Sequence, residues 1–108
     1  MRIEMDLALQ ELIQNREGTS KQYKSIANNS TLYSGLIRAY QVLESVDSVD
    51  ELRVYSFLHY ERLKYGYSGL SSVRLDNRYV HHLIFQEIDD YITLKLITID
   101  DTHYGNKK

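Results

Sequence analysis

The residue types best suited to chemistry are concentrated in one stretch of the chain, from Leu52 to His82. It holds five cations against two acids, together with three histidines: Arg53, Arg62, Lys64, Arg74 and Arg78, then Glu61 and Asp76, then His59, His81 and His82. Cations attract phosphate groups, and imidazole changes its charge near neutral pH. The whole chain carries a net charge of −2, which argues weakly against a nucleic-acid binder. The acids gather elsewhere, however, so this stretch can still present a positive face.

Some of these residues also have plain structural interpretations. Glu61 and Lys64 are three positions apart and can form an exposed ion pair worth about 0.3 kcal/mol. Arg74 alternates with apolar Val73 and Leu75, so a strand would expose it whatever its role. Exposure alone therefore assigns it no function.

The histidines do not have the spacing of a metal site. His81 and His82 are adjacent in a predicted strand, so their side chains point to opposite faces and cannot both bind one metal. His59 and His103 add no recognised metal-ligand spacing. We expect no metal and no cofactor.

Helices are predicted for the first half of the chain, over residues 6–15, 20–27 and 31–45. In the first, Leu9, Leu12 and Ile13 share one face, and Asp6 can cap the start. The third has the clearest apolar stripe, with spacings of four, three and four residues: Leu32, Leu36, Ala39 and Leu43. Ser48 with Glu51 forms a capping-box pattern, which predicts a helical turn starting near Val49. Residues 52–58 suit a buried helix or a strand equally.

The second half of the chain changes to the period of strands. Residues 70–76, 79–88 and 91–99 read as three strands, separated by the turn signals Asp76-Asn77 and Asp89-Asp90. Strands joined by tight turns form an antiparallel meander. The predicted fold is therefore a single α+β domain over residues 1–108, with N-terminal helices on one face of a small antiparallel sheet and the other face open.

The stretch from Glu61 to Leu75 resembles a segment of the RelE/ParE toxin superfamily, and most closely its YoeB-like branch. The family pattern is Glu-x-Leu-Lys, a short gap, Ser-Gly, an apolar residue, and then a strand with Ser and Arg. The chain reads Glu-Arg-Leu-Lys, then Ser68-Gly69-Leu70, then a strand with Arg74. The resemblance continues loosely through residues 83–85 and returns at His103-Tyr104, the pair that closes YoeB-like chains.

This resemblance implies a metal-independent endoribonuclease, the toxin of a type II toxin–antitoxin system. YoeB-like toxins enter the ribosomal decoding site and cut messenger RNA through attack of a ribose 2′-hydroxyl on the next phosphate. By resemblance Glu61 is the base, His103 is the acid, and Tyr104 stacks or positions the substrate. Lys64 and Arg74 would bind RNA at phosphate-facing positions. The partners implied are a cognate antitoxin protein and messenger RNA in the ribosome.

The chain departs from the family pattern at His82. The family has a phosphate-binding arginine there, and the hairpin between Arg74 and His82 is two residues longer here. Three alternatives remain open: Arg78 reaches the RNA-binding site from the turn, His82 serves as a titrating catalytic group, or the site binds without cutting. In the last case the chain would be a non-catalytic toxin acting on a protein target, as ParE-like relatives act on DNA gyrase. Besides the nuclease toxin and the toxin that binds a protein, a third hypothesis is a small binding domain that shares only the α+β layout.

The composition indicates the cell compartment in which the protein is expected. The chain has no cysteine and no apolar run near the ~20 residues of a membrane span, and its start lacks a signal-peptide pattern. We therefore expect a cytoplasmic protein with no membrane partner. The oligomeric state stays open, a homodimer included.

Overall fold

Three amphipathic helices lie in the first half of the chain, and each begins after a polar capping residue. In the computed structural model, which describes residues 1–64, 69–88 and 93–101, they are α1 (Leu7–Asn15), α2 (Lys21–Ala27) and α3 (Ser30–Ser45). The side chains of Asp6, Ser20 and Asn29 each accept a hydrogen bond from the backbone N–H three residues on, which satisfies one of the free donors of a helix start. The three predicted helices are confirmed to within one residue at each end.

Two 3-10 helices follow α3: η1 (Val49–Val54) and η2 (Ser56–Leu58). The turn predicted at Val49 is confirmed. The apolar residues after it form neither an α-helix nor a strand, and Leu52 and Leu58 are buried there.

The strands form a five-stranded sheet in the order β1-β5-β4-β3-β2. They are β1 (Arg2–Glu4), β2 (Glu61–Arg62), β3 (Ser71–Arg74), β4 (His82–Ile88) and β5 (Thr93–Asp100). The predicted meander is confirmed in its pairing, because β4 pairs antiparallel with both β3 and β5. Two of its strands are shorter than predicted: β3 covers 71–74 rather than 70–76, and β4 begins at His82 rather than Tyr79. The expectation of a wholly antiparallel sheet is wrong at one edge, where β1 runs parallel to β5. Two parallel strands need a long connection between them. Nothing in the three residues of β1 predicts that they pair with a strand near the other end of the chain.

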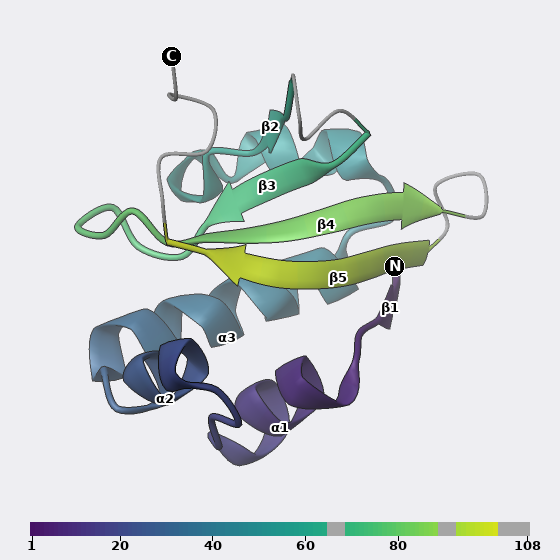
Figure 1. Cartoon of the computed structure of the whole chain (residues 1–108). Coiled ribbons are helices and arrows are strands. Elements are labelled where there is room, and N and C mark those ends of the chain that lie inside the picture. Colours follow the sequence, from purple (N-terminus) through teal and green to yellow (C-terminus); the bar gives the residue numbers. More distant parts are fainter. Residues whose placement is uncertain (65–68, 89–92, 102–108) are drawn as a thin grey trace.

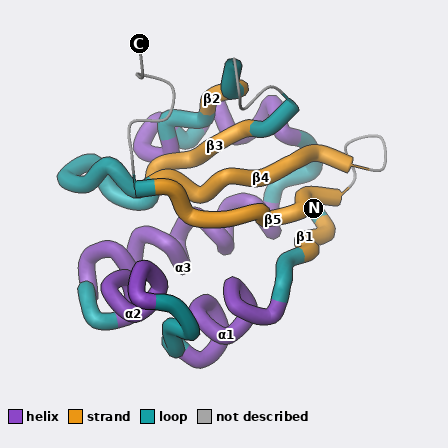
Figure 2. Tube along the Cα trace, viewed as in Figure 1, coloured by secondary structure: helices purple, strands orange, loops and turns teal. Residues whose placement is uncertain are grey.

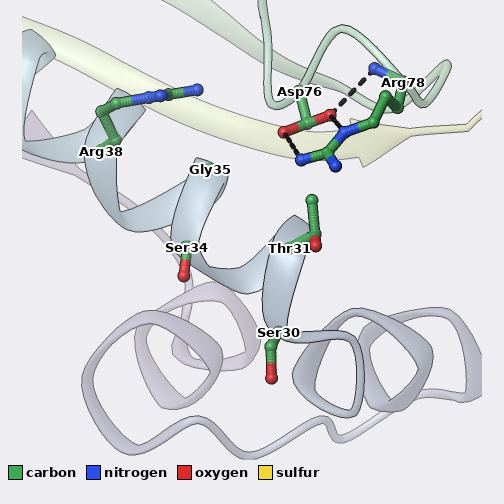
Figure 3. A pocket seen from close by; sticks show the side chains of 7 residues that line it. All are labelled: Ser30, Thr31, Ser34, Gly35, Arg38, Asp76 and Arg78. Carbon is green, nitrogen blue, oxygen red and sulfur yellow. Dashed lines mark hydrogen bonds and ion pairs between the residues drawn. The ribbon is translucent and has the colours of Figure 1, made fainter.

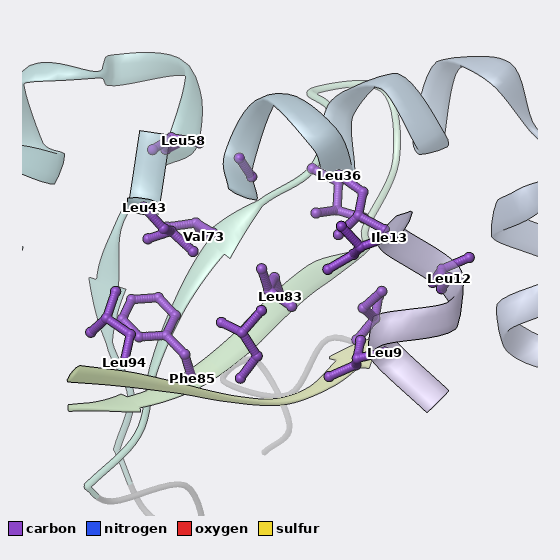
Figure 4. Packing of buried hydrophobic residues seen from close by; sticks show 14 of the residues in the cluster. Leu9, Leu12, Ile13, Leu36, Leu43, Leu58, Val73, Leu83, Phe85 and Leu94 are labelled. Atoms are coloured by element: carbon purple, nitrogen blue, oxygen red, sulfur yellow. The ribbon is translucent and has the colours of Figure 1, made fainter. Parts of the chain in front are cut away.

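The helices cover one face of the sheet, as Figures 1 and 2 show. Leu9, Leu12 and Leu36 belong to the same buried core as Leu83 and Phe85 of the central strand, and Figure 4 shows part of this core. A register shift between Ile84 and Phe85 leaves an extra residue in β5, and a bulge of this kind changes which side chains face the core. Leu96 and Ile99 are therefore both buried in the helix-facing core, although they are three residues apart.

The opposite face of the sheet is not open along its whole length. Ile84 and Leu63 are buried in a second, small apolar cluster, with Leu70 and Ile97 packed against it, and the side chain of Ser72 is fully buried. The expectation of an open face is therefore wrong for its middle. None of the helices in the described ranges is long and apolar enough to cross a membrane.

Candidate functional site

Arg74, His82 and Asp100 form a row across three strands at one end of the sheet. Arg74 of β3 pairs with His82 of β4, and His82 pairs with Asp100 of β5. Directly paired residues of antiparallel strands share a face, about 5 Å apart. Their chain neighbours Val73 and Leu83 belong to the helix-facing core, so the row lies on the face away from the helices.

The Arg74 side chain is anchored to the turn between β3 and β4. Its Nη1 donates a hydrogen bond to the Tyr79 carbonyl oxygen at 3.0 Å. Its Nε is buried and has no hydrogen-bond partner in the part of the chain that the structure describes. Because a buried donor of a permanent cation is costly to leave unpaired, an anionic oxygen is the natural complement of this position.

The backbone fixes the tautomer of His82. Its Nδ1 lies 2.6 Å from the Val80 carbonyl oxygen, and a carbonyl can only accept, so Nδ1 carries a proton. The nitrogen that gains or loses a proton is then Nε2. A histidine held in this way is oriented for proton transfer or, when protonated, for binding an anion.

His81 is partly buried and lies beside the same strand end. Burial lowers the pKa of its imidazole, and the nearby carboxylates of Asp101 and Asp100 oppose that shift. Its ring stands edge-on to Tyr79, with centroids 6.0 Å apart. These contacts give His81 a structural role, and its side chain is not part of the row formed by Arg74, His82 and Asp100.

Glu61 lies on the same face as Arg74 and His82, one step along the sheet. It pairs with Ser72, two residues before Arg74 on β3, and it is exposed. From the standard spacing of strands and residues, the Glu61 Cα lies about 12 Å from that of His82, which leaves room between the side chains for a ribose and a phosphate. Lys64 is exposed just after β2. Within the described ranges, Glu61 and Lys64 form no ion pair with each other.

Arg78 is turned away from this row. Its Nε and Nη2 contact the Asp76 carboxylate at 3.1 and 3.3 Å, and these hydrogen bonds hold the pKa of Asp76 below its usual value. Both residues line a hollow of about 430 Å³ against α3 (Figure 3). The structure therefore brings Arg74 and His82 together, with Glu61 nearby, but not Arg78.

His103 and Tyr104 lie outside the described residues, and so does the expected bend between Asp100 and His103. The described part of β5 ends at Asp100. Among the described residues, no group of three or more His, Cys, Asp or Glu side chains is placed to hold a metal ion.

Two acids near the sheet were not singled out from the sequence. Asp100 enters the row only through the register of the β4–β5 hairpin, which residue spacing alone does not fix. Glu87 has a 9% exposed side chain beside Arg62 and accepts a hydrogen bond from the Tyr60 hydroxyl at 3.2 Å. Glu87 follows the apolar run Leu83-Ile84-Phe85 and is the only carboxylate of the central strand, which was the available signal for it.

Comparisons with known proteins find similarity in structure but not in sequence. No protein-family model matches the chain, and no curated protein matches it. Among solved structures, a YoeB/ParE toxin from Agrobacterium tumefaciens superposes with a TM-score of 0.55 over 95% of this chain and 100% of that one, at 11% sequence identity. Since an identity this low shows the fold alone, the conclusion is that the chain has the α+β fold of a YoeB/ParE toxin.

Proposed function

We propose that the chain is the toxin of a toxin–antitoxin pair and that its sheet face binds and cleaves RNA. The observation that carries the proposal is the pairing of Arg74 with His82 on the face where Glu61 also lies. A base and two groups able to bind phosphate thus share one surface. The toxin fold supports the same interpretation.

The reaction proposed is attack of a ribose 2′-hydroxyl on the adjacent phosphate. Glu61 takes the hydroxyl proton, and Arg74 stabilises the charge that gathers on the phosphate oxygens. His82 binds the same phosphate as imidazolium or moves a proton through Nε2. His103 protonates the leaving 5′-oxygen, Tyr104 positions the nucleotide, and Lys64 contacts the RNA backbone.

The substrate proposed is messenger RNA in the ribosomal decoding site, and the protein partner is an antitoxin encoded in the neighbouring reading frame. The alternative is a toxin of the same fold that binds a protein target, DNA gyrase for example, without cutting RNA. Histidine in place of the family arginine favours this alternative, and so does the buried middle of the sheet face, where Ser72 and Ile84 are covered.

Induction of the chain in growing cells tests the proposal. Messenger RNA ends are mapped after induction, with and without a block of translation initiation. We expect new ends within translated messages and their loss when ribosomes no longer engage. Growth arrest with intact messages would instead support the protein-binding alternative.

A further inference from the structure

Arg38 of α3 and Arg78 of the β3–β4 turn face a hollow that the proposed reaction does not use. The hollow measures about 430 Å³, and Thr31, Gly35 and Asp76 also line it. Figure 3 shows the two guanidinium groups reaching toward it from opposite sides. Gly35 lets the turn approach α3 closely, because an added Cβ would overlap the Leu75 carbonyl oxygen.

Both arginines are held in place by groups outside the hollow or at its rim. The Arg38 guanidinium lies 4.5 Å from the centre of the Phe57 ring. Arg78 donates hydrogen bonds from Nε and Nη2 to the Asp76 carboxylate. A guanidinium has five N–H donors, so this contact leaves three of them for a ligand. Arginines oriented beforehand lose less conformational entropy when they bind an anion.

The hollow has an excess of positive charge. Two guanidinium groups face one carboxylate, and Asp76 keeps its negative charge at neutral pH because the hydrogen bonds from Arg78 lower its pKa. Within the described ranges, Arg38 forms no ion pair with a carboxylate. The surplus charge and the free donors together fit one phosphate-sized anion.

We propose that this hollow binds a backbone phosphate of the RNA that lies on the sheet face, which gives the RNA a second attachment point. Only three residues separate Arg74 from Arg78, and Arg74 is itself bonded to Tyr79 of the same turn. A strand that leaves the Arg74–His82 pair at this end of the sheet passes the turn and reaches the hollow. The choice of RNA as the source of the phosphate rests on the proposed function.

The test measures binding of a decanucleotide RNA whose 2′-hydroxyls are all methylated, so that it cannot be cleaved. The double variant Arg38→Gln/Arg78→Gln is compared with Arg2→Gln/Arg53→Gln, which removes two exposed arginines elsewhere. We expect the hollow variant to bind about tenfold more weakly than the control, with a salt slope smaller by about 0.7, since the single phosphate in the hollow contributes about 0.7 for a single strand.

A second variant separates ligand binding from a structural role. Asp76→Asn keeps Oδ1, which accepts hydrogen bonds from both the Arg78 backbone N–H and Nε, so Arg78 stays oriented while the negative charge leaves the hollow. RNA affinity should then rise about threefold, because a repulsive charge near the phosphate is gone. A purely structural Asp76 would give unchanged or weaker binding.

The outcomes that overturn the inference are distinct. Equal RNA affinity of the hollow and control variants, together with cleavage that depends on Glu61, overturns the second attachment point and leaves the proposed function standing. A decamer of glutamate that binds the hollow more tightly than RNA does overturns the choice of RNA. Failure of the unchanged protein to bind the RNA overturns the second attachment point, and intact messages after induction overturn the proposed function as well.

Discussion

At the scale of single residues, His82 stands where the resemblance seen in the sequence would place an arginine. An arginine keeps its charge at every accessible pH, whereas an imidazole ordinarily titrates near pH 6.5. Arg74 and Asp100 flank His82 in the row and His81 precedes it, so opposite charges act on it from the two neighbouring strands. Phosphate binding through His82 therefore brings a pH dependence that arginine lacks.

We expect RNA affinity to fall between pH 6 and pH 8 and expect His82→Arg to remove most of that fall, because only the protonated imidazole attracts phosphate. The measurement is binding of the methylated decanucleotide across this range, with exposed His59→Asn as the control. An identical pH profile in the unchanged protein and His82→Arg would exclude His82 from the phosphate site. Cleavage by His82→Arg should equal or exceed that of the unchanged protein.

Glu61→Ala and His103→Ala should each lower the cleavage rate about 10²-fold or more, the usual loss for a general base or acid. Glu61 is exposed, so its replacement should leave the unfolding temperature unchanged. Rates are measured on ribosome-bound messenger RNA, with exposed Glu17→Ala as the control. Full toxicity of both variants in cells would rule out the nuclease mechanism.

His81 makes folding stability depend on pH. Burial lowers its pKa in the folded protein, so below about pH 6.5 the unfolded chain takes up a proton more readily than the folded one. The contribution is therefore present above pH 6.5 and is lost as the pH falls below it. Urea unfolding between pH 5 and pH 8 should show a smaller loss of stability at low pH for His81→Gln, whereas exposed His59→Asn should behave like the unchanged protein.

At the scale of the elements, the approach of α3 to the β3–β4 turn depends on Gly35. Alanine normally stabilises the interior of a helix relative to glycine by up to about 1 kcal/mol. Here its Cβ would overlap the Leu75 carbonyl oxygen, a backbone atom that cannot rotate away.

Gly35→Ala should therefore destabilise the protein by about 1–3 kcal/mol, the usual cost of overpacking. Urea unfolding measures this change, and Gln41→Ala on the exposed side of α3 serves as the control, with a neutral or slightly stabilising effect. Stabilisation by Gly35→Ala would mean that α3 and the turn are not packed as closely as described.

The elements also show which parts of the structure the sequence could predict. The three helices were predictable because their caps and apolar stripes are local features, as at Asp6 and Asn29. The parallel pairing of β1 and the bulge beside Ile84 depend on contacts between distant parts of the chain. The direction of the Arg78 side chain could not be predicted either, because the spacing of residues in the turn does not show whether the side chain points to the sheet face or to α3.

At the scale of the whole molecule, RNA binding has to overcome the repulsion from a net charge of −2. Arg74 and Lys64 lie at or beside the strands, but so do the acids Glu61 and Asp100, and α1 to α3 carry three cations (Lys21, Lys24 and Arg38) against the two acids Glu11 and Glu44. RNA binding at the sheet face would therefore depend on the local field of Arg74, Lys64 and a protonated His82 rather than on a general separation of charge. Such a field acts over about a Debye length, near 10 Å at 0.1 M salt.

RNA binding should therefore weaken steeply as salt rises, because each phosphate that meets a cation releases bound counterions. With one phosphate at Arg74 and His82, one at Lys64 and one in the hollow engaged at pH 6, we expect a slope of log affinity against log salt near −2, since three single-strand phosphate contacts contribute about 0.7 each. Binding of the methylated decanucleotide between 50 and 300 mM salt measures the slope, and Lys64→Gln/Arg74→Gln should flatten it, whereas Lys21→Gln/Lys24→Gln on α2 should not. A slope near zero, with growth arrest retained in cells, would mean that the sheet face does not bind phosphates and that the chain acts on a protein instead.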